Sequence, residues 1–266
     1  MTYEPLGPWM LPADLEELHD VVIDFAVAVN GRADAQYEKN ISKGPLSFKA
    51  LQRLHRTGIV THRSVKSLCV AGWTPTTPSV MRTLVDVLVS IIQIAQTAKD
   101  AEFMGFRYMA HGFIEGMYDQ DAEPALQELD ALQVQLLKSN LPDADMARAD
   151  QLIVDYKTRR RPYWYWPQVS NPGNFIKDNM PQLWVLWHSF CGATHGADIG
   201  SVLFHDDPNG AGINPEENPR RTRMATVISS RFLLDNSHAR AEFEGVADDE
   251  DYRRVVRDFI RPQQGR

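Results

Sequence analysis

Cysteine is scarce in this sequence: Cys69 and Cys191 are the only two in 266 residues and lie far apart. We therefore expect no disulfide framework and a cytoplasmic location, where thiols stay reduced. The first residues lack a basic segment followed by a long apolar one, so we also expect no signal peptide. The formal net charge of −7 argues against a generic nucleic-acid-binding surface but allows a local basic patch.

Long apolar segments without charges are missing as well. The most apolar segment, residues 79–96, carries Arg82 and Asp86 near its start. A membrane-spanning helix needs about 18 or more apolar residues with few charges. We therefore expect a core helix in this segment and no membrane contact.

Strand patterns and the common catalytic motifs are also absent from the sequence. No segment alternates apolar and polar residues between hairpin turns. There is no phosphate loop, dinucleotide fingerprint, nucleophile elbow or HExxH motif. The sequence therefore indicates no cofactor and no familiar enzyme class.

Helical periodicity is what the sequence has in abundance. Asp14, Ser47 and Thr61 are expected to cap helices, and Asn30-Gly31, Gly58 and Gly72 are expected to end them. The apolar spacing and these end signals predict helices at 14–30, 47–58, 61–72, 78–98, 99–118, 121–140, 143–160, 179–197, 220–243 and 248–260, with a loop at 162–174. Eight to ten helices without strands predict an all-α protein, a single helical bundle over residues 1–266.

The segment HSFCGATHG concentrates reactive side chains at the end of one predicted helix. His188, Cys191 and His195 are spaced i, i+3 and i+7, so they share one helix face. With His205 or Asp206 they could ligate zinc in a metal-dependent hydrolase, although two helical turns span roughly 10 Å, too far for one ion without help. The alternative is a packed helix end, with His195 in the last turn where a substrate can reach it.

Arg82 and Asp86 lie one turn apart on an otherwise apolar helix. A lone buried charge is costly whereas a pair is tolerated, so an internal ion pair is one expectation. The other is that Asp86 holds Arg82 ready for an anionic ligand.

A second polar stripe repeats at i, i+4 and i+8 through Arg107, His111 and Glu115. A histidine between an arginine and a glutamate could act as an acid or base on a bound substrate. A solvated, salt-bridged helix face explains the same pattern.

Residues 159–168, RRRPYWYWPQ, combine arginines with aromatic rings. Arg159, Arg160 and Trp164 could therefore contact phosphates and stack on bases. The alternative is an aromatic loop that plugs the bundle, with the arginines at a helix C-terminus. Further arginine clusters at 220–223 and 253–261 would add to a basic surface if the fold brings them together.

Two of these segments, in this order, resemble a known family. An R-x-L-x-[ED] motif, here Arg82 to Asp86, is followed about a hundred residues later by [SC]-x-x-x-H-G, here Cys191 to Gly196. Over residues 60–240 the chain resembles a family of prokaryotic all-helical proteins known mainly as a domain of unknown function. It is also distantly similar to HEPN domains, the RNA-associated helical bundles of toxins and defence systems. Asp86 and Cys191 depart from the commoner glutamate and serine.

The resemblance implies a HEPN-like core in a cytoplasmic homodimer that binds RNA or a nucleotide, with a role in stress or phage defence. The ligand would lie near Arg82, Asp86, His188 and His195. In a cleavage reaction His195 would be the acid or base, and Arg82 would stabilise the charge of the phosphorane.

Active HEPN ribonucleases also carry an arginine shortly before the histidine, and positions 188–190 hold none. An R-x5-H string does run from Arg56 to His62, but we interpret it as chance because Gly58 and Thr61 predict a helix boundary inside it. We therefore expect degenerate or absent ribonuclease activity. A non-enzymatic interaction module is the alternative.

Overall fold

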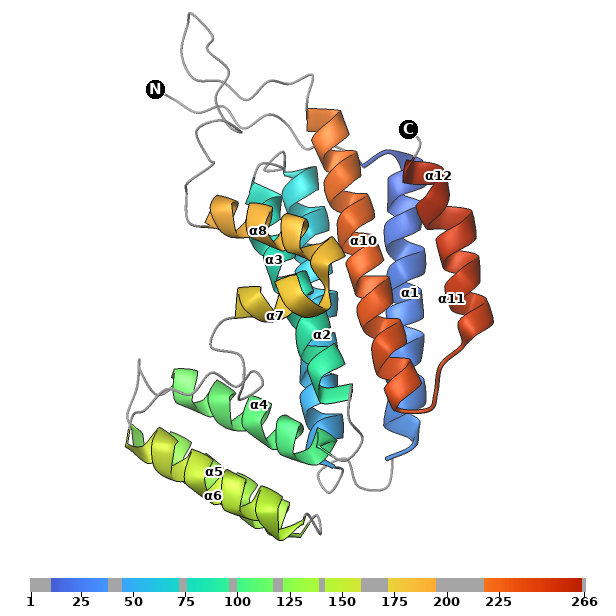
Figure 1. Cartoon of the computed structure of the whole chain (residues 1–266). Helices are drawn as coiled ribbons and strands as arrows, with labels where there is room; N and C mark the ends of the chain where they lie inside the picture. Colours follow the sequence, from blue (N-terminus) through green and yellow to red (C-terminus); the bar gives the residue numbers. More distant parts are fainter. Residues whose placement is uncertain are drawn as a thin grey trace, which may run out of the picture.

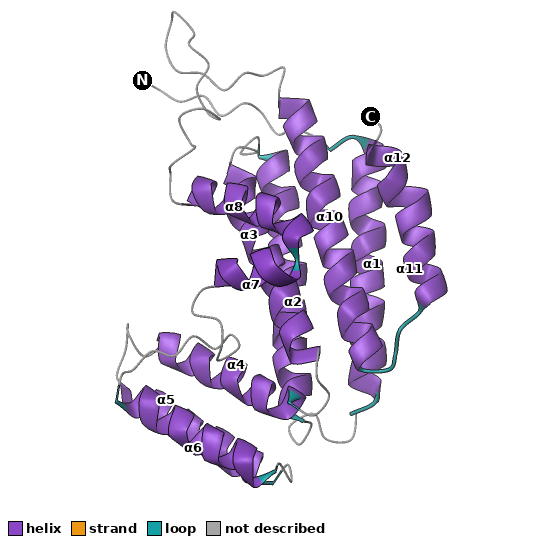
Figure 2. Cartoon of the chain, in the orientation of Figure 1, coloured by secondary structure: helices purple, strands orange, loops and turns teal. Residues whose placement is uncertain are grey.

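The chain is all-helical throughout the part that the structure describes. This computed structural model describes residues 11–37, 45–71, 76–95, 100–116, 122–138, 142–158, 172–194 and 218–264, and these residues hold no strand (Figure 2). The prediction of an all-α bundle is confirmed. If the consecutive helical segments from 249 to 264 count as one, the described residues form ten helices.

The helices follow one another with short connections. They are α1 (Ala13–Ala35), α2 (Leu46–Val70), α3 (Thr77–Ala95), α4 (Ala101–Gly116), α5 (Ala122–Leu137), α6 (Asp143–Lys157), α7 (Pro172–Asn179), α8 (Pro181–Thr194), α10 (Asn218–Phe243), α11 (Asp249–Val255), a π-helical segment (Val256–Ile260) and α12 (Arg261–Gln264).

Helix α10 is the centre of the bundle and packs against α1, α2 and α3 (Figure 1). Helices α11 and α12 cover the outer side of α1, and α8 runs across α3 next to the short helix α7. Helices α4, α5 and α6 gather at the far end of α2, apart from α8.

Two hydrophobic clusters hold these groups together, and α2 and α3 contribute to both. The first cluster joins α1, α3, α7, α8, α10 and α11, and includes Leu84, Trp187 and Leu233. The second joins the start of α2 to α4, α5 and α6, and includes Leu51 and Ile91. Each fully buried aliphatic side chain contributes about 1.5–3 kcal/mol, so burial on both faces fixes α2 and α3 in place.

Helix α3 is the one helix in the described residues that is long and apolar enough to cross a membrane by length and composition. More than half of its apolar window is buried inside the bundle. This burial agrees with the prediction of a core helix.

Helix α2 corrects the prediction of two helices at 47–58 and 61–72. It continues through Gly58 and Thr61 without a break. A Cβ at Gly58 would lie 3.5 Å from side-chain atoms of Leu233 and Asn236, which is ordinary contact. Packing of α2 against α10 and α3 therefore overrides the local signal of the glycine.

The start of α2 is also capped differently from the prediction. Ser47 lies inside the helix, and the carboxylate of Glu102 on α4 accepts the backbone N–H groups of Leu46 at 2.9 Å and Ser47 at 3.0 Å. The Ser47 hydroxyl donates to the same carboxylate. The backbones approach so closely here that a Cβ at Gly105 would lie 2.5 Å from the Ser47 nitrogen. A side chain from another helix thus replaces the expected local cap.

Other predicted helix ends are shifted for similar reasons. Helix α1 passes through Asn30-Gly31 to Ala35 and has no side-chain cap; Asp14 instead accepts a hydrogen bond from Arg223 at 3.0 Å. Helix α7 begins at Pro172, inside the predicted loop 162–174. Proline suits a first helical position because its fixed φ is already helical and no N–H is required there.

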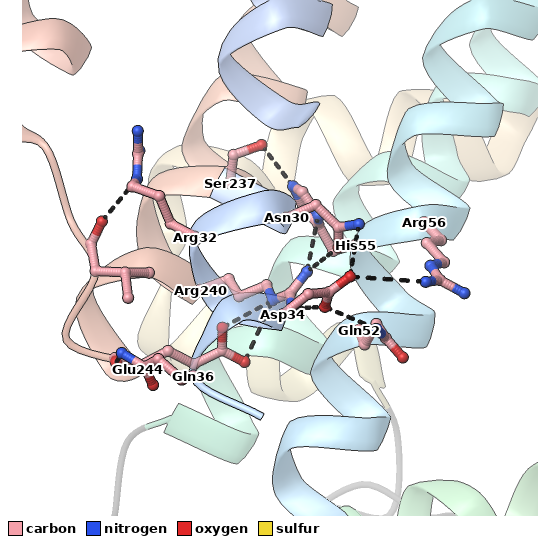
Figure 3. A network of polar contacts seen from close by, with 11 residues as sticks. Asn30, Arg32, Asp34, Gln36, Gln52, His55, Arg56, Ser237, Arg240 and Glu244 are labelled. Atoms are coloured by element: carbon pink, nitrogen blue, oxygen red, sulfur yellow. Dashed lines mark hydrogen bonds and ion pairs between the residues drawn. The ribbon is translucent and has the colours of Figure 1, made fainter. Parts of the chain in front are cut away.

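A buried polar network joins α1, α2 and α10 (Figure 3). Arg240 is fully buried, and its guanidinium donates to Asn30 Oδ1 at 2.7 Å and to Glu244 Oε2 at 3.1 Å. The His55 ring lies between Arg240 Nη1, 3.1 Å from Nδ1, and Ser237 Oγ, 2.8 Å from Nε2. Because Ser237 already donates to Leu233 O, its oxygen accepts from Nε2–H, and Nδ1 accepts from Arg240. His55 is therefore the neutral Nε2–H tautomer.

Candidate functional site

Helices α3 and α8 bring together the two motifs that lie a hundred residues apart in sequence. The indole Nε1–H of Trp187 on α8 donates a hydrogen bond to Asp86 Oδ1 on α3, with a distance of 3.0 Å. Arg82, one turn before Asp86, holds its guanidinium over the Trp187 ring, 5.5 Å from the centroid. Together with Trp184, His188 and Cys191 of α8, these residues form what we call the α3–α8 site.

Arg82 and Asp86 form the predicted ion pair, but at the edge of the bundle rather than deep inside it. The Arg82 Nε atom lies 3.7 Å from Asp86 Oδ2, and the two side chains are 28% and 33% exposed. Such a pair contributes little to stability, about 0–1 kcal/mol. Its main consequence is geometric, because Asp86 fixes the position of a guanidinium that solvent can reach.

Burial governs the protonation of the acidic groups at the α3–α8 site. It raises the pKa of Asp86, although the Trp187 hydrogen bond and the Arg82 charge oppose this shift. Burial also raises the pKa of the Cys191 thiol, which Arg82 lowers in part and Asp86 raises further. Cys191 is therefore a protonated thiol at neutral pH and not an activated nucleophile.

Three rings on α8 line up beside Arg82. Trp184 stacks on Trp187, with 5.6 Å between the ring centroids, and on His188, with 5.4 Å. Trp187 is buried, Trp184 is partly exposed and His188 is exposed. Neither tryptophan is among the predicted site residues, although their i, i+3 spacing next to His188 is visible in the segment LWVLWH.

The second predicted stripe lies elsewhere in the molecule. Arg107 and His111 are on α4, which packs with α5 and α6 and not beside α8 (Figure 1). Arg107 is buried, with its guanidinium 5.9 Å from the centroid of the Phe103 ring, so a solvated face is the wrong interpretation at this position. His111 is partly exposed. The structure therefore does not bring either residue to the α3–α8 site.

Several predicted residues fall outside the described part of the chain. His195 lies just after the end of α8, and Arg159, Arg160 and Trp164 lie between α6 and α7; none of them is in the described ranges. The same holds for His205 and Asp206 and for the Glu115 side chain. Among the described residues, no group of three metal-ligating side chains contains His188 or Cys191.

The R-x5-H string is not a joint site, but the expected reason was wrong. Arg56 and His62 lie on one continuous helix, with no boundary between them. The Arg56 side chain is 60% exposed and lies 3.9 Å from Asp34, whereas the buried His62 ring has its Nδ1 atom 3.1 Å from Ser229 Oγ. The two side chains therefore point into different environments.

The described C-terminal arginines do not form an uncompensated basic surface. Arg223 pairs with Asp14, and Arg253, Arg254 and Arg257 each pair with a nearby aspartate. Within this part of the chain, carboxylates neutralise much of the charge that a phosphate backbone would need.

Comparisons with family models, with curated proteins and with solved structures found no match to this chain.

Proposed function

We propose that the α3–α8 site binds a nucleotide, either free or within single-stranded RNA. The observation that carries this proposal is the position of Arg82, whose guanidinium is held by Asp86 over Trp187 while remaining partly exposed. A fixed guanidinium suits bidentate contact with phosphate oxygens. The neighbouring Trp184 and His188 rings offer partly exposed faces, and stacking of a base on an aromatic ring contributes about 1–3 kcal/mol.

We expect binding without efficient cleavage. No arginine occupies positions 188–190 before His195, and Arg82 is engaged by Asp86. The Cys191 thiol, whose pKa burial raises, supplies no replacement nucleophile. RNA cleavage by the purified protein that is lost in His195→Ala would contradict this expectation.

A binding experiment tests the proposal directly. Fluorescence polarisation with a labelled single-stranded RNA, with AMP and ATP as competitors, measures the affinity of the untagged protein. Arg82→Gln removes the guanidinium and should weaken binding at least tenfold, and Trp184→Leu should weaken it by the stacking contribution of about 1–3 kcal/mol. Binding should also weaken as the salt concentration rises.

Arg148 provides a matched control because it has the same chemistry elsewhere. Its guanidinium lies 4.3 Å from the centroid of the Phe103 ring and pairs with Asp145 at 2.7 Å. Arg148→Gln should leave the affinity unchanged. Equal affinities of the wild-type protein and Arg82→Gln, or no binding of RNA and nucleotides at all, would reject the proposal.

A non-enzymatic interaction module is the second candidate, and one observation favours it. Both oxygens of Asp86 already face partners within the chain, Trp187 and Arg82. This arrangement suits a lock between α3 and α8. In that case Arg82→Gln and Trp187→Phe lower the melting temperature and change no ligand affinity.

The assembly and cellular role are proposals that rest on the motif resemblance. We propose a cytoplasmic homodimer with a HEPN-like core and an accessory role in stress or phage defence. Sedimentation velocity over a range of protein concentrations tests the dimer, and a single monomeric species throughout would exclude it.

A further inference from the structure

The turn between α10 and α11 gathers three side chains that can ligate a metal ion. His238 and Glu242 lie one turn apart near the end of α10, and Asp249 is the first residue of α11. His238 Nε2 is 3.4 Å from Glu242 Oε1 and 3.8 Å from Asp249 Oδ1. One donor atom from each residue lies within 4.8 Å of the other two.

The backbone of the turn explains why Asp249 returns to α10. Gly245 has a φ of 68°, a left-handed conformation that glycine adopts without strain. The N–H of Val246 then bonds to Ala241 O at 2.9 Å and that of Gly245 to Glu242 O at 3.2 Å, which closes the helix end. Asp248 caps α11 by accepting the Asp251 N–H, so the cap does not use the Asp249 carboxylate.

The His238 ring is held in place by its neighbours before any ion binds. It stacks on Tyr252, with 4.0 Å between the centroids and an interplanar angle of 13°. The Tyr252 hydroxyl donates to Asp235 at 2.9 Å and accepts from Arg231 at 3.0 Å. Burial and the Asp235 charge raise the pKa of Tyr252 to about 12, so this phenol remains a neutral donor. The imidazole is therefore oriented by stacking on a tyrosine that is itself fixed.

The distances between the donor atoms suit a small tetrahedral ion. Zinc–nitrogen and zinc–oxygen bonds of about 2.0–2.2 Å place neighbouring ligand atoms roughly 3.3–3.5 Å apart, close to the observed 3.4 and 3.8 Å. The Glu242 and Asp249 side chains are 61% and 57% exposed, so they can close the remaining gap. Arg253 lies 3.7 Å from Asp249 Oδ2, which leaves Oδ1 for the ion.

We propose that His238, Glu242 and Asp249 bind one divalent transition-metal ion of the zinc type. One imidazole and two carboxylates leave a fourth position for water, and the exposed carboxylates give the ion an entry path. Two ligands come from α10 and one from α11, so the bound ion links these helices. Because the ion binds the folded protein through residues that the fold assembles, it raises the stability of the protein.

Metal titration of the untagged, chelator-treated protein tests this site. Isothermal titration calorimetry with ZnCl₂ should show one ion per chain, and Co²⁺ should give a visible absorption band as the spectroscopic readout. Glu242→Gln keeps the exposed surface position and loses the charge, and His238→Gln removes the imidazole. Each variant should weaken zinc binding at least about tenfold, because loss even of outer-shell partners costs that much.

Two control variants test whether the ion binds at these three residues and not elsewhere on the protein. Asp258→Asn removes an exposed carboxylate that pairs with Arg257 on the same C-terminal helical segment, and should leave the affinity unchanged. His188→Gln removes the exposed histidine of α8 and should also have no effect. Loss of binding in His188→Gln but not in Glu242→Gln would overturn the proposal in favour of an ion on α8. No zinc binding to the wild-type protein would overturn it outright.

Discussion

The Trp187 indole donates a hydrogen bond to the carboxylate of Asp86 across 101 residues of sequence. This bond fixes α8 against α3 and places the Trp187 ring beneath the Arg82 guanidinium. The polar contact and the aromatic contact thus share one side chain. A substitution that removes only the N–H can separate the lock between the helices from the support of Arg82.

Trp187→Phe keeps a ring under Arg82 and removes the donor to Asp86. A hydrogen bond to a charged group contributes about 1.5–3 kcal/mol when buried, and less here because the Asp86 side chain is 33% exposed. We expect a loss of roughly 1–2 kcal/mol in the free energy of unfolding, measured by urea denaturation. RNA affinity should stay within a few fold of the wild type. An unchanged stability would show that the bond between α3 and α8 is not a structural lock.

Asp86→Asn should strengthen RNA binding. The asparagine Oδ1 still accepts from Trp187, while the negative charge that competes for Arg82 is lost. Burial raises the pKa of Asp86, so the ionised carboxylate is disfavoured in the folded protein and the neutral amide is well tolerated. We expect a several-fold lower Kd by fluorescence polarisation. Asp145→Asn beside Arg148 is the control, and an equal gain in both variants would indicate a general charge effect.

The fold class follows from the sequence, whereas several helix boundaries do not. Helical spacing predicts the all-α bundle because each helix buries one apolar face. Gly58 and Thr61 nevertheless lie inside α2, because contacts with α10 and α3 compensate for a weak local preference. The carboxylate that caps α2 belongs to Glu102, 56 residues after Leu46, and no local pattern reveals a cap from another helix.

The candidate site is only partly predictable from the sequence. The motif resemblance selects Arg82, Asp86 and Cys191, and the structure brings α3 and α8 together at these residues. Trp184 and Trp187 escape such a prediction because a tryptophan on an apolar helix has the pattern of a core residue. The cluster of His238, Glu242 and Asp249 escapes it as well, because it depends on the direction in which the chain leaves α10.

Gly105→Ala and Gly58→Ala should have opposite effects on stability. A Cβ at position 105 would lie 2.5 Å from a backbone nitrogen of α2, so α4 must move away. At position 58 the nearest atoms are 3.5 Å away, and alanine gains about 1 kcal/mol in helix propensity. We expect Gly105→Ala to lower the urea midpoint and Gly58→Ala to raise or maintain it. The reverse order would contradict the close approach of α4 and α2.

Arg240→Met should be among the most destabilising single substitutions in the chain. It removes the guanidinium that pairs with Glu244 and donates to Asn30, and leaves a nearly buried carboxylate without its cation. Loss of one partner of a buried ion pair costs about 3–5 kcal/mol. Arg254→Met, at an exposed pair with Asp251, should cost less than about 1 kcal/mol. Similar urea midpoints for the two variants would show that the network in Figure 3 contributes no more than a surface pair.

Mild acid should destabilise the fold through two buried histidines. Burial lowers the pKa of His55 and of His62 to about 3, and nearby cations lower both further. In the unfolded chain each ring takes up a proton near pH 6.5. Between these values the unfolded state binds more protons, so the free energy of unfolding decreases as the pH falls below about 6.5, by up to about 1.4 kcal/mol per pH unit for each histidine.

His62→Gln isolates one of these two contributions. A glutamine at this position cannot be protonated, so the variant should lose less stability than the wild type between pH 6.5 and 4.5. Urea denaturation at a series of pH values gives the slope for each protein. The variant is expected to be less stable at pH 7, because the ring packs on His19 and its Nδ1 atom lies within hydrogen-bonding distance of Ser229. The difference in slope is therefore the deciding quantity, and equal slopes would mean that His62 is not a neutral buried ring in the folded protein.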